Sequence, residues 1–151
     1  MFSKQQASLL KQQFWTSFGR YMAPVPASDG SRINWVNYKT GVKDLFFTLQ
    51  ADNRTATIAI TAVHKDPEKQ SLVFNQLLQL KGLLRVALQE DWEWALQQPD
   101  EYNKTVSRIY LSRARVNIYK QEDWPAIISF FKPRLIALDA FWTDVRDGFM
   151  L

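Results

Sequence analysis

Apolar residues recur every three to four positions near both ends of the chain, the spacing of amphipathic helices. Ser3 is a suitable N-cap for the first helix, and Pro24 ends it. Its apolar stripe consists of Leu10, Phe14, Phe18 and Tyr21. The last helix is expected to start at Asp123, and Pro133 should kink it or divide it in two. Its stripe consists of Trp124, Ile128, Phe131, Leu135, Leu138, Trp142, Val145 and Phe149.

Alternating apolar and polar residues predict an antiparallel sheet between these helices. The strongest signal is a hairpin in which residues 44–50 and 55–63 flank a tight turn at Asp52 and Asn53. Further β-prone runs are found at residues 33–38, 92–96 and 106–116.

A third helix is predicted over residues 66–89, because Asp66 can cap it and Pro67 suits its first position. Its inner stripe consists of Val73, Leu77, Leu80, Leu84 and Leu88. The predicted element order is therefore α-β-β-β-α-β-β-α. The sequence indicates an α+β fold, a mainly antiparallel sheet packed by helices, with residues 1–151 forming a single domain.

Composition adds limits to this prediction. The chain has 151 residues, 46% of them hydrophobic and 14% aromatic, which is ample for one core. It contains no cysteine, so disulfides, zinc–thiolate sites and thiol nucleophiles are excluded. No apolar run approaches the about 20 residues of a membrane-spanning helix, and the N-terminus has no signal-peptide features. We therefore expect a soluble, cytoplasmic protein without a membrane partner. The net charge of +4 permits an anionic partner without requiring one.

The order α-β-β-β-α-β is similar to the core of restriction endonucleases. That core requires an acid on the hairpin and an acid-x-Lys motif on the next strand, where the acids hold Mg²⁺. Asp44 and Asp52 are candidates for the first acid, and Lys65 matches the lysine. Val63 occupies the place of the second carboxylate and cannot ligate a metal ion, although Glu68 could replace it from the following helix.

Other catalytic arrangements have little support in the sequence. His64 is the only histidine, and we interpret it as a polar residue that forms hydrogen bonds at a strand-to-helix junction. Glu90, Asp91 and Glu93 cluster after the third helix, where a solvated edge explains them better than an acid/base pair. Nucleotide-binding glycine motifs are absent.

Basic residues next to aromatic ones suggest nucleic-acid binding, in which cations contact phosphates and rings stack on bases. Charged residues on a solvated sheet edge, which keep strands from pairing with other chains, are the simpler alternative. The candidate binding residues are Arg32, Trp35, Tyr38, Lys39, Arg108, Arg113 and Arg115.

Aromatic residues cover more than one face of the last helix, namely Phe130, Phe131, Phe141 and Trp142. Such a helix is either central in its own domain or buried against a second chain. A homodimer is therefore a further hypothesis.

Several segments resemble a bacterial family of domains of unknown function, the one numbered four-two-six-eight. These segments are residues 14–18, 34–41, 91–94, 107–110 and 123–142. The resemblance implies a restriction-endonuclease-like ancestry, and some members carry the domain after a nuclease-like domain. Its motifs are aromatic and structural, so they carry no functional residues over to this chain.

Together these observations favour a non-catalytic binding or assembly domain on a nuclease-like scaffold, associated with DNA or RNA and needing no cofactor. One alternative is a metal-dependent nuclease with a migrated acid, which would use Mg²⁺. The other is a structural homodimerisation domain.

Overall fold

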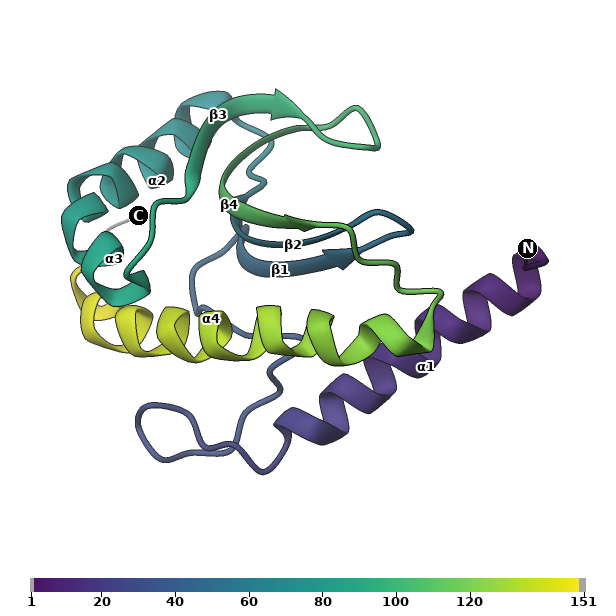
Figure 1. Cartoon of the computed structure of the whole chain (residues 1–151). Helices are drawn as coiled ribbons and strands as arrows, with labels where there is room; N and C mark the ends of the chain where they lie inside the picture. Colours follow the sequence, from purple (N-terminus) through teal and green to yellow (C-terminus); the bar gives the residue numbers. More distant parts are fainter. Residues whose placement is uncertain (1, 150–151) are drawn as a thin grey trace.

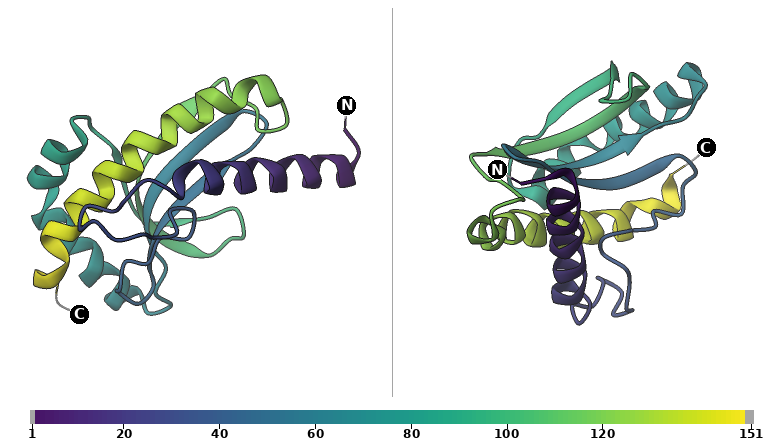
Figure 2. Two further views of the ribbon diagram at one scale, coloured as in Figure 1. Left: turned by 90° about the horizontal axis from the view of Figure 1, so that it is seen from below. Right: turned by 90° about the vertical axis from the view of Figure 1, so that its right-hand side faces the viewer.

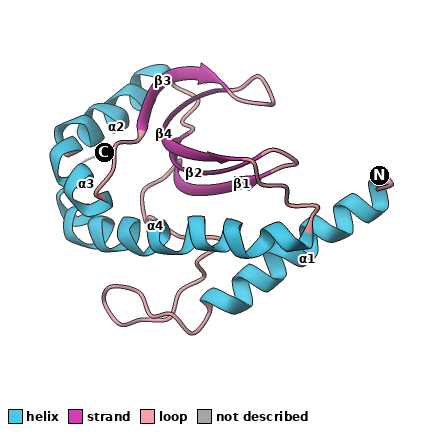
Figure 3. Cartoon of the chain, viewed as in Figure 1, coloured by secondary structure: helices cyan, strands magenta, loops and turns pink. Residues whose placement is uncertain are grey.

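A four-stranded antiparallel sheet, with strands in the order β1-β2-β4-β3, forms the centre of the molecule (Figure 1). The computed structural model describes residues 2–149. The elements in chain order are α1 (Lys4–Met22), β1 (Leu45–Ala51), β2 (Thr55–Ala62), α2 (Pro67–Gln79), α3 (Lys81–Leu88), β3 (Glu93–Pro99), β4 (Thr105–Ala114) and α4 (Trp124–Val145), with short 3₁₀ turns at Gln121–Asp123 and Arg146–Gly148. The predicted α+β class with a helix-packed antiparallel sheet is confirmed (Figure 3).

Helix α1 begins where its capping residues predict. The Ser3 hydroxyl accepts the backbone N–H of Gln6, and the Gln6 side chain accepts the N–H of Ser3. This reciprocal pair satisfies two of the donors that a helix N-terminus leaves free. The buried face of α1 carries Phe14 and Phe18, both of which contact Phe131 or Trp124 of the α4 region.

The predicted hairpin is the β1–β2 pair, in register from Leu45 opposite Ala62 to Ala51 opposite Ala56. The apolar residues that alternate along these strands share one face, which we call the inner face. It carries Leu45, Phe47, Ile58, Ile60 and Ile109, all of them buried. Phe47 contacts the Trp142 ring of α4, with centroids 6.1 Å apart, so this face packs against the helices.

The segment 33–38 differs in detail from the prediction, because it contributes no strand of its own. A single β-bridge joins Lys39 to Phe46 at its end. The side-chain oxygen of Asn34 accepts the N–H groups of Val36 and Asn37, which turns the backbone away from an extended path. This local hydrogen bonding overrides the β propensity of the run.

The predicted helix over residues 66–89 is two helices, α2 and α3, which meet at Leu80. Leu80 has φ −98° and ψ 9°, outside the helical region, and Gly82 follows closely. Asp66 caps α2 as predicted by accepting the N–H of Glu68. The predicted apolar stripe is confirmed on both sides of the break. Val73, Leu77 and Leu84 are buried, and Leu80 and Leu88 pack on the same core.

Helix α4 is continuous through Pro133, so the proline does not divide it. Proline at this position removes the N–H that would bind the carbonyl of Ser129. Both residues are exposed, so water can satisfy that carbonyl. In two views α4 runs alongside the sheet, with the second half of α1 next to it (Figure 2).

The β3–β4 hairpin curls away from the plane of β1 and β2 (Figure 1). A bulge between Ala95 and Gln98 lies opposite Ser107, at the point where the curl starts. The Ser107 hydroxyl accepts the N–H of Gln97 and donates to the buried side chain of Gln70, which holds the bulge on α2.

The tip of this hairpin returns to β1, where the Gln50 side chain donates a 3.2 Å hydrogen bond to the Glu101 carboxylate. The sheet is thus concave on the side opposite the helices, which we call the outer face.

Candidate functional site

The outer face is a surface of short polar side chains flanked by aromatic and basic residues. One cross-strand row consists of Phe46, Thr61 and Arg108, and the next consists of Thr48, Ala59 and Tyr110. Because the central strand β2 carries only small residues here, its surface lies lower than the side chains on either side. Phe46 is 44% exposed although it is large and apolar.

Arg108 and Tyr110 form a stacked pair on β4, with the guanidinium carbon 4.1 Å from the ring centroid. A hydrogen bond to the Glu93 carboxylate, with burial adding to it, raises the pKa of the Tyr110 hydroxyl, which stays protonated at neutral pH. The Thr57 and Ser112 hydroxyls lie 2.7 Å apart nearby. The outer face therefore offers a cation–aromatic pair and several hydroxyl groups.

Three exposed arginines gather at the end of the sheet near the β1–β2 turn. Arg113 is paired with Ala56 in the β2–β4 register, and the carbonyl of Arg54 accepts the N–H of Val116, next to Arg115. None of the three arginines forms an ion pair with any residue between positions 2 and 149. We call Arg54, Arg113 and Arg115 the arginine cluster. The Asp52 carboxylate lies in the same turn but bonds to backbone N–H groups, so the three guanidinium groups remain available to an anion.

The predicted aromatic binders Trp35 and Tyr38 are core residues, so their assignment to base stacking is wrong. Trp35 is 2% exposed and donates its indole N–H to the carbonyl of Val25. Tyr38 is 7% exposed and donates its hydroxyl to the Asp139 carboxylate at 2.5 Å. Burial, together with this hydrogen bond, raises the pKa of Tyr38 above its ordinary value.

Arg32 and Lys39 remain exposed, but they line a different hollow from the one reached by the sheet arginines. That hollow has a volume of about 400 Å³ and also includes Asp139 and Arg146. The seven predicted binding residues therefore do not form one surface. Arg108 lies on the outer face, Arg113 belongs with Arg115 to the arginine cluster, and the others lie around the 24–40 loop.

The two candidate first acids of the nuclease interpretation lie at opposite ends of β1. They flank a strand of seven residues, so eight residue steps, or about 26 Å, separate Asp44 from Asp52 along the chain. The Asp52 carboxylate accepts the N–H groups of Arg54 and Thr55 and so closes the hairpin turn. Burial disfavours its charge, but these hydrogen bonds outweigh burial and lower the pKa of Asp52. Asp52 therefore has a structural role.

Asp44 lies at the corner where the sequence places the incomplete metal motif. Its carbonyl accepts the N–H of Val63, and its carboxylate is 3.9 Å from Nε2 of His64. Lys65 and Glu68 are exposed beyond this corner. No group of three or more His, Asp or Glu side chains within residues 2–149 is arranged to hold a metal ion. Mg²⁺ prefers several oxygen ligands in octahedral geometry, and the described residues of this corner do not fit that requirement.

His64 has the structural role that its position suggests. Its Nδ1 accepts the N–H of Asp66 at 3.0 Å, directly before α2. The interpretation of His64 as a hydrogen-bonding residue at the junction is confirmed.

The acids after α3 diverge, as a solvated edge requires. Glu90 accepts two hydrogen bonds from the guanidinium of Arg134, at 2.8 and 3.0 Å. Partial burial raises the pKa of Glu90, but Arg134 and the Trp92 indole outweigh it and lower the pKa overall. Asp91 pairs with Arg85 on the surface. Glu93 bonds to Tyr110, so each of the three carboxylates has a different partner.

Sequence reasoning missed Phe46, Tyr110 and Arg54. Phe46 could have been found, since it lies between Leu45 and Phe47 and must point to the opposite face of the sheet. Arg54 joins Arg113 only through strand pairing, which local sequence does not show.

The aromatic residues of α4 are buried in the core of their own chain, with Phe130, Phe131, Phe141 and Trp142 all nearly inaccessible. They require no second chain to cover them. The observation that suggested a homodimer is therefore accounted for, and the oligomeric state remains a prediction.

These features define an α+β domain with helices on the inner face of an antiparallel sheet and a polar outer face that carries the Arg108–Tyr110 pair. The chain belongs to the family described as a domain of unknown function, DUF4268, whose model matches residues 10–146. Neither the curated proteins nor the solved structures include a significant match. In the described part of the chain, no helix has the length and hydrophobicity needed to cross a membrane.

Proposed function

We propose that the domain binds single-stranded nucleic acid on the outer face of its sheet, without catalysing a reaction on it. The observation that carries this proposal is the stacked Arg108–Tyr110 pair on the outer face, together with the unpaired arginine cluster at the end of the same sheet. Arg113 is paired with the core residue Ala56 and so points to the inner side, which means that a strand bound on the outer face reaches the cluster by passing over this end of the sheet. Bases stack on aromatic rings and guanidinium planes, while exposed arginines contact phosphates.

The shape of the face favours single strands over duplexes. A base can lie on Phe46 or Tyr110 only when it is not paired and stacked within a helix. The β3–β4 hairpin returns to β1 through the Gln50–Glu101 bond and narrows access to the face. Ala59 and Thr61 of β2 are only 2% and 9% exposed, so a base is expected to lie across the flanking side chains of β1 and β4 and not on β2 itself.

Fluorescence anisotropy with labelled single-stranded DNA, single-stranded RNA and duplex DNA tests this proposal over a series of salt concentrations. The salt slope is the slope of the logarithm of the binding constant against the logarithm of salt concentration. Each phosphate contact contributes about 0.7 to it for single strands, so replacing the three arginines of the cluster by glutamine should reduce the slope by about 2. The matched control replaces Arg32, Lys43 and Lys69 by glutamine. It removes the same charge from exposed positions elsewhere and should change the slope little.

Stacking is tested separately by Phe46→Ala combined with Tyr110→Ala. Base stacking contributes about 1–3 kcal/mol per base, so this variant should bind at least about tenfold more weakly while keeping its salt slope. Absence of binding at low salt, or equal effects of the arginine cluster and its control, contradicts the proposal. Cleavage of the strand with Mg²⁺ or Mn²⁺ would instead support the metal-dependent nuclease alternative.

A further inference from the structure

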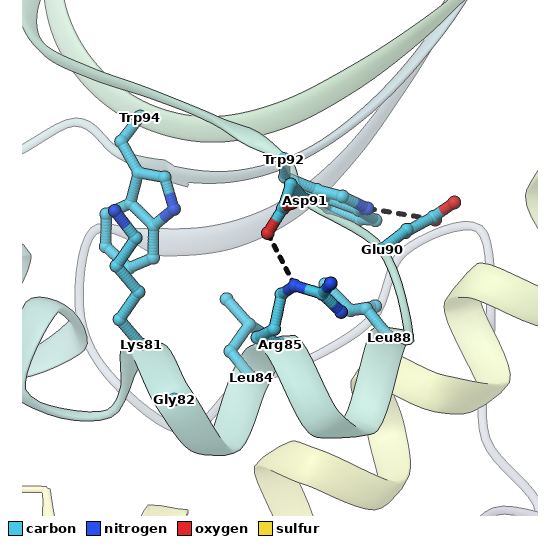
Figure 4. A pocket seen from close by; sticks show the side chains of 9 residues that line it. All are labelled: Lys81, Gly82, Leu84, Arg85, Leu88, Glu90, Asp91, Trp92 and Trp94. Atoms are coloured by element: carbon cyan, nitrogen blue, oxygen red, sulfur yellow. Dashed lines mark hydrogen bonds and ion pairs between the residues drawn. The ribbon is translucent and has the colours of Figure 1, made fainter.

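A hollow lies between α3 and the segment that leads into β3, separate from the outer face (Figure 4). Its volume is about 350 Å³, which is at the lower end of the about 300–1,000 Å³ typical of ligand pockets. Leu84, Leu88 and Trp92 provide its apolar surface. A ligand with one or two rings fits this volume.

Trp94 provides one wall of the hollow and has unused binding capacity. Its ring edge packs against Phe74, with an interplanar angle of 82°, and Nζ of Lys81 lies 5.2 Å from its centroid. Four of the six tryptophans donate their indole N–H within the chain. The Trp94 N–H has no hydrogen-bond acceptor among residues 2–149, and Figure 4 shows its nitrogen on the side facing Asp91 and Arg85.

The charges around the hollow leave room for an anion. Arg85 and Asp91 form a 2.6 Å ion pair, but their side chains are 52% and 81% exposed. Such surface pairs contribute little to stability, so a ligand can replace one partner at low cost. Glu90 also borders the hollow, but Arg134 holds its carboxylate. Lys81 and Arg85 against Asp91 leave one net positive charge.

We propose that this hollow binds a planar heteroaromatic ring that carries an anionic group, the chemistry of a nucleoside monophosphate. The ring stacks on Trp94 in place of the Lys81 ammonium, and the indole N–H donates to a ring nitrogen or carbonyl. The displaced Lys81 pairs with the phosphate together with Arg85. The site does not depend on nucleic-acid binding at the outer face, because it lies on the opposite side of β3.

The ligand can be a free mononucleotide or the terminal nucleotide of a strand. The indole N–H signals in a ¹H–¹⁵N correlation spectrum of the full chain test both, with Trp94→Phe identifying the Trp94 signal. The probes are AMP, UMP, adenosine, inorganic phosphate and a 5′-phosphorylated oligonucleotide. AMP is expected to shift the Trp94 signal in a saturable manner, adenosine to bind about tenfold more weakly because it lacks the charge, and phosphate alone to leave the signal unchanged.

Substitutions of two exposed residues test which side chains contact the phosphate. Lys81→Met and Arg85→Gln should each reduce the preference for AMP over adenosine to less than about threefold. Lys69→Met, an exposed lysine of α2, serves as the control and should leave the preference unchanged. The other indole signals show whether each variant is folded.

A Trp94 signal that does not move with AMP, UMP or the oligonucleotide overturns the proposal, as does an AMP preference that survives both variants. A shift at lower concentration with the oligonucleotide than with AMP identifies the strand end as the source, and the reverse identifies the free nucleotide. Because the Phe46 and arginine-cluster variants leave this hollow intact, failure here is distinguishable from failure of the outer-face proposal.

Discussion

The hydrogen bond between Tyr38 and Asp139 is expected to fasten the 24–44 segment to α4. Asp139 is 3% exposed and accepts the Tyr38 hydroxyl at 2.5 Å and the backbone N–H of Ser28 at 2.6 Å. Hydrogen bonds to charged groups contribute about 1.5–3 kcal/mol each, so Tyr38→Phe should lower the free energy of unfolding by that amount. Asp139→Ala also leaves the Ser28 donor without its partner and should cost about 3–5 kcal/mol.

A double-mutant cycle isolates the contribution of the Tyr38–Asp139 hydrogen bond to the free energy of unfolding. The Tyr38→Phe and Asp139→Ala double variant should cost less than the sum of the single variants by about 1.5 kcal/mol or more, because Phe leaves no hydroxyl unpaired. Urea unfolding followed by tryptophan fluorescence gives each value, and Tyr38→Phe should lower Tm by about 3–12 °C for a domain of this size.

Tyr102→Phe is the matched control for this cycle, because Tyr102 is largely exposed and its hydroxyl makes no hydrogen bond with a described residue. It should leave stability unchanged. A Tyr38→Phe variant that is as stable as the control, or a cycle without coupling, would refute the structural role of Tyr38. If that variant also bound nucleic acid more weakly, Tyr38 would return as a binding residue.

Three further changes have expected outcomes. Pro133→Ala restores a hydrogen bond inside α4 and should raise the free energy of unfolding by about 1–3 kcal/mol in urea denaturation. Gln70→Leu removes the side-chain N–H groups that bridge the carbonyls of His64 and Thr105, and should cost about 2–4 kcal/mol, with faster amide hydrogen exchange in β4. The pKa of Glu90 is lower in the folded protein than in the unfolded chain, so its charged carboxylate stabilises the fold at pH values above its ordinary pKa. This stabilisation is lost as the pH falls through the pKa of the folded state. The stability difference between wild type and Glu90→Gln should therefore be constant near neutrality and shrink below about pH 4.5, in unfolding curves recorded across that range.

The helices and the hairpin were predictable from the sequence because their signals are local. Ser3 and Asp66 are caps that act within three residues, and the alternation around Phe47 fixes which side chains of β1 point inward. The break at Leu80 was harder to predict from the sequence, because the apolar stripe continues across it and only the backbone changes direction.

The binding site was predictable only in part, because its residues meet through tertiary contacts. Trp35 and Tyr38 resemble exposed stacking residues in sequence, next to Arg32 and Lys39. Their burial depends on partners such as Asp139, 101 residues later in the chain. Strand pairing likewise brings Arg54 and Arg113 together. A local pattern can identify basic and aromatic residues, but it does not show which of them share a surface.

On the outer face, the side chains of β2 are smaller than those that a central strand usually carries, and this determines where a ligand can contact the sheet. β-branched and aromatic side chains are favoured on strands and alanine is depleted, yet Ala59 lies in the middle of β2 on a side where no helix packs. On either side of it are Thr48 and Tyr110, with Phe46 exposed one row away. Ala59 is only 2% exposed, so the side chains around it already cover β2 and a larger residue there would have to displace them. Under the function we propose, a base therefore lies across Phe46 and the Arg108–Tyr110 pair, and these side chains, not the small residues of β2, provide the stacking surface.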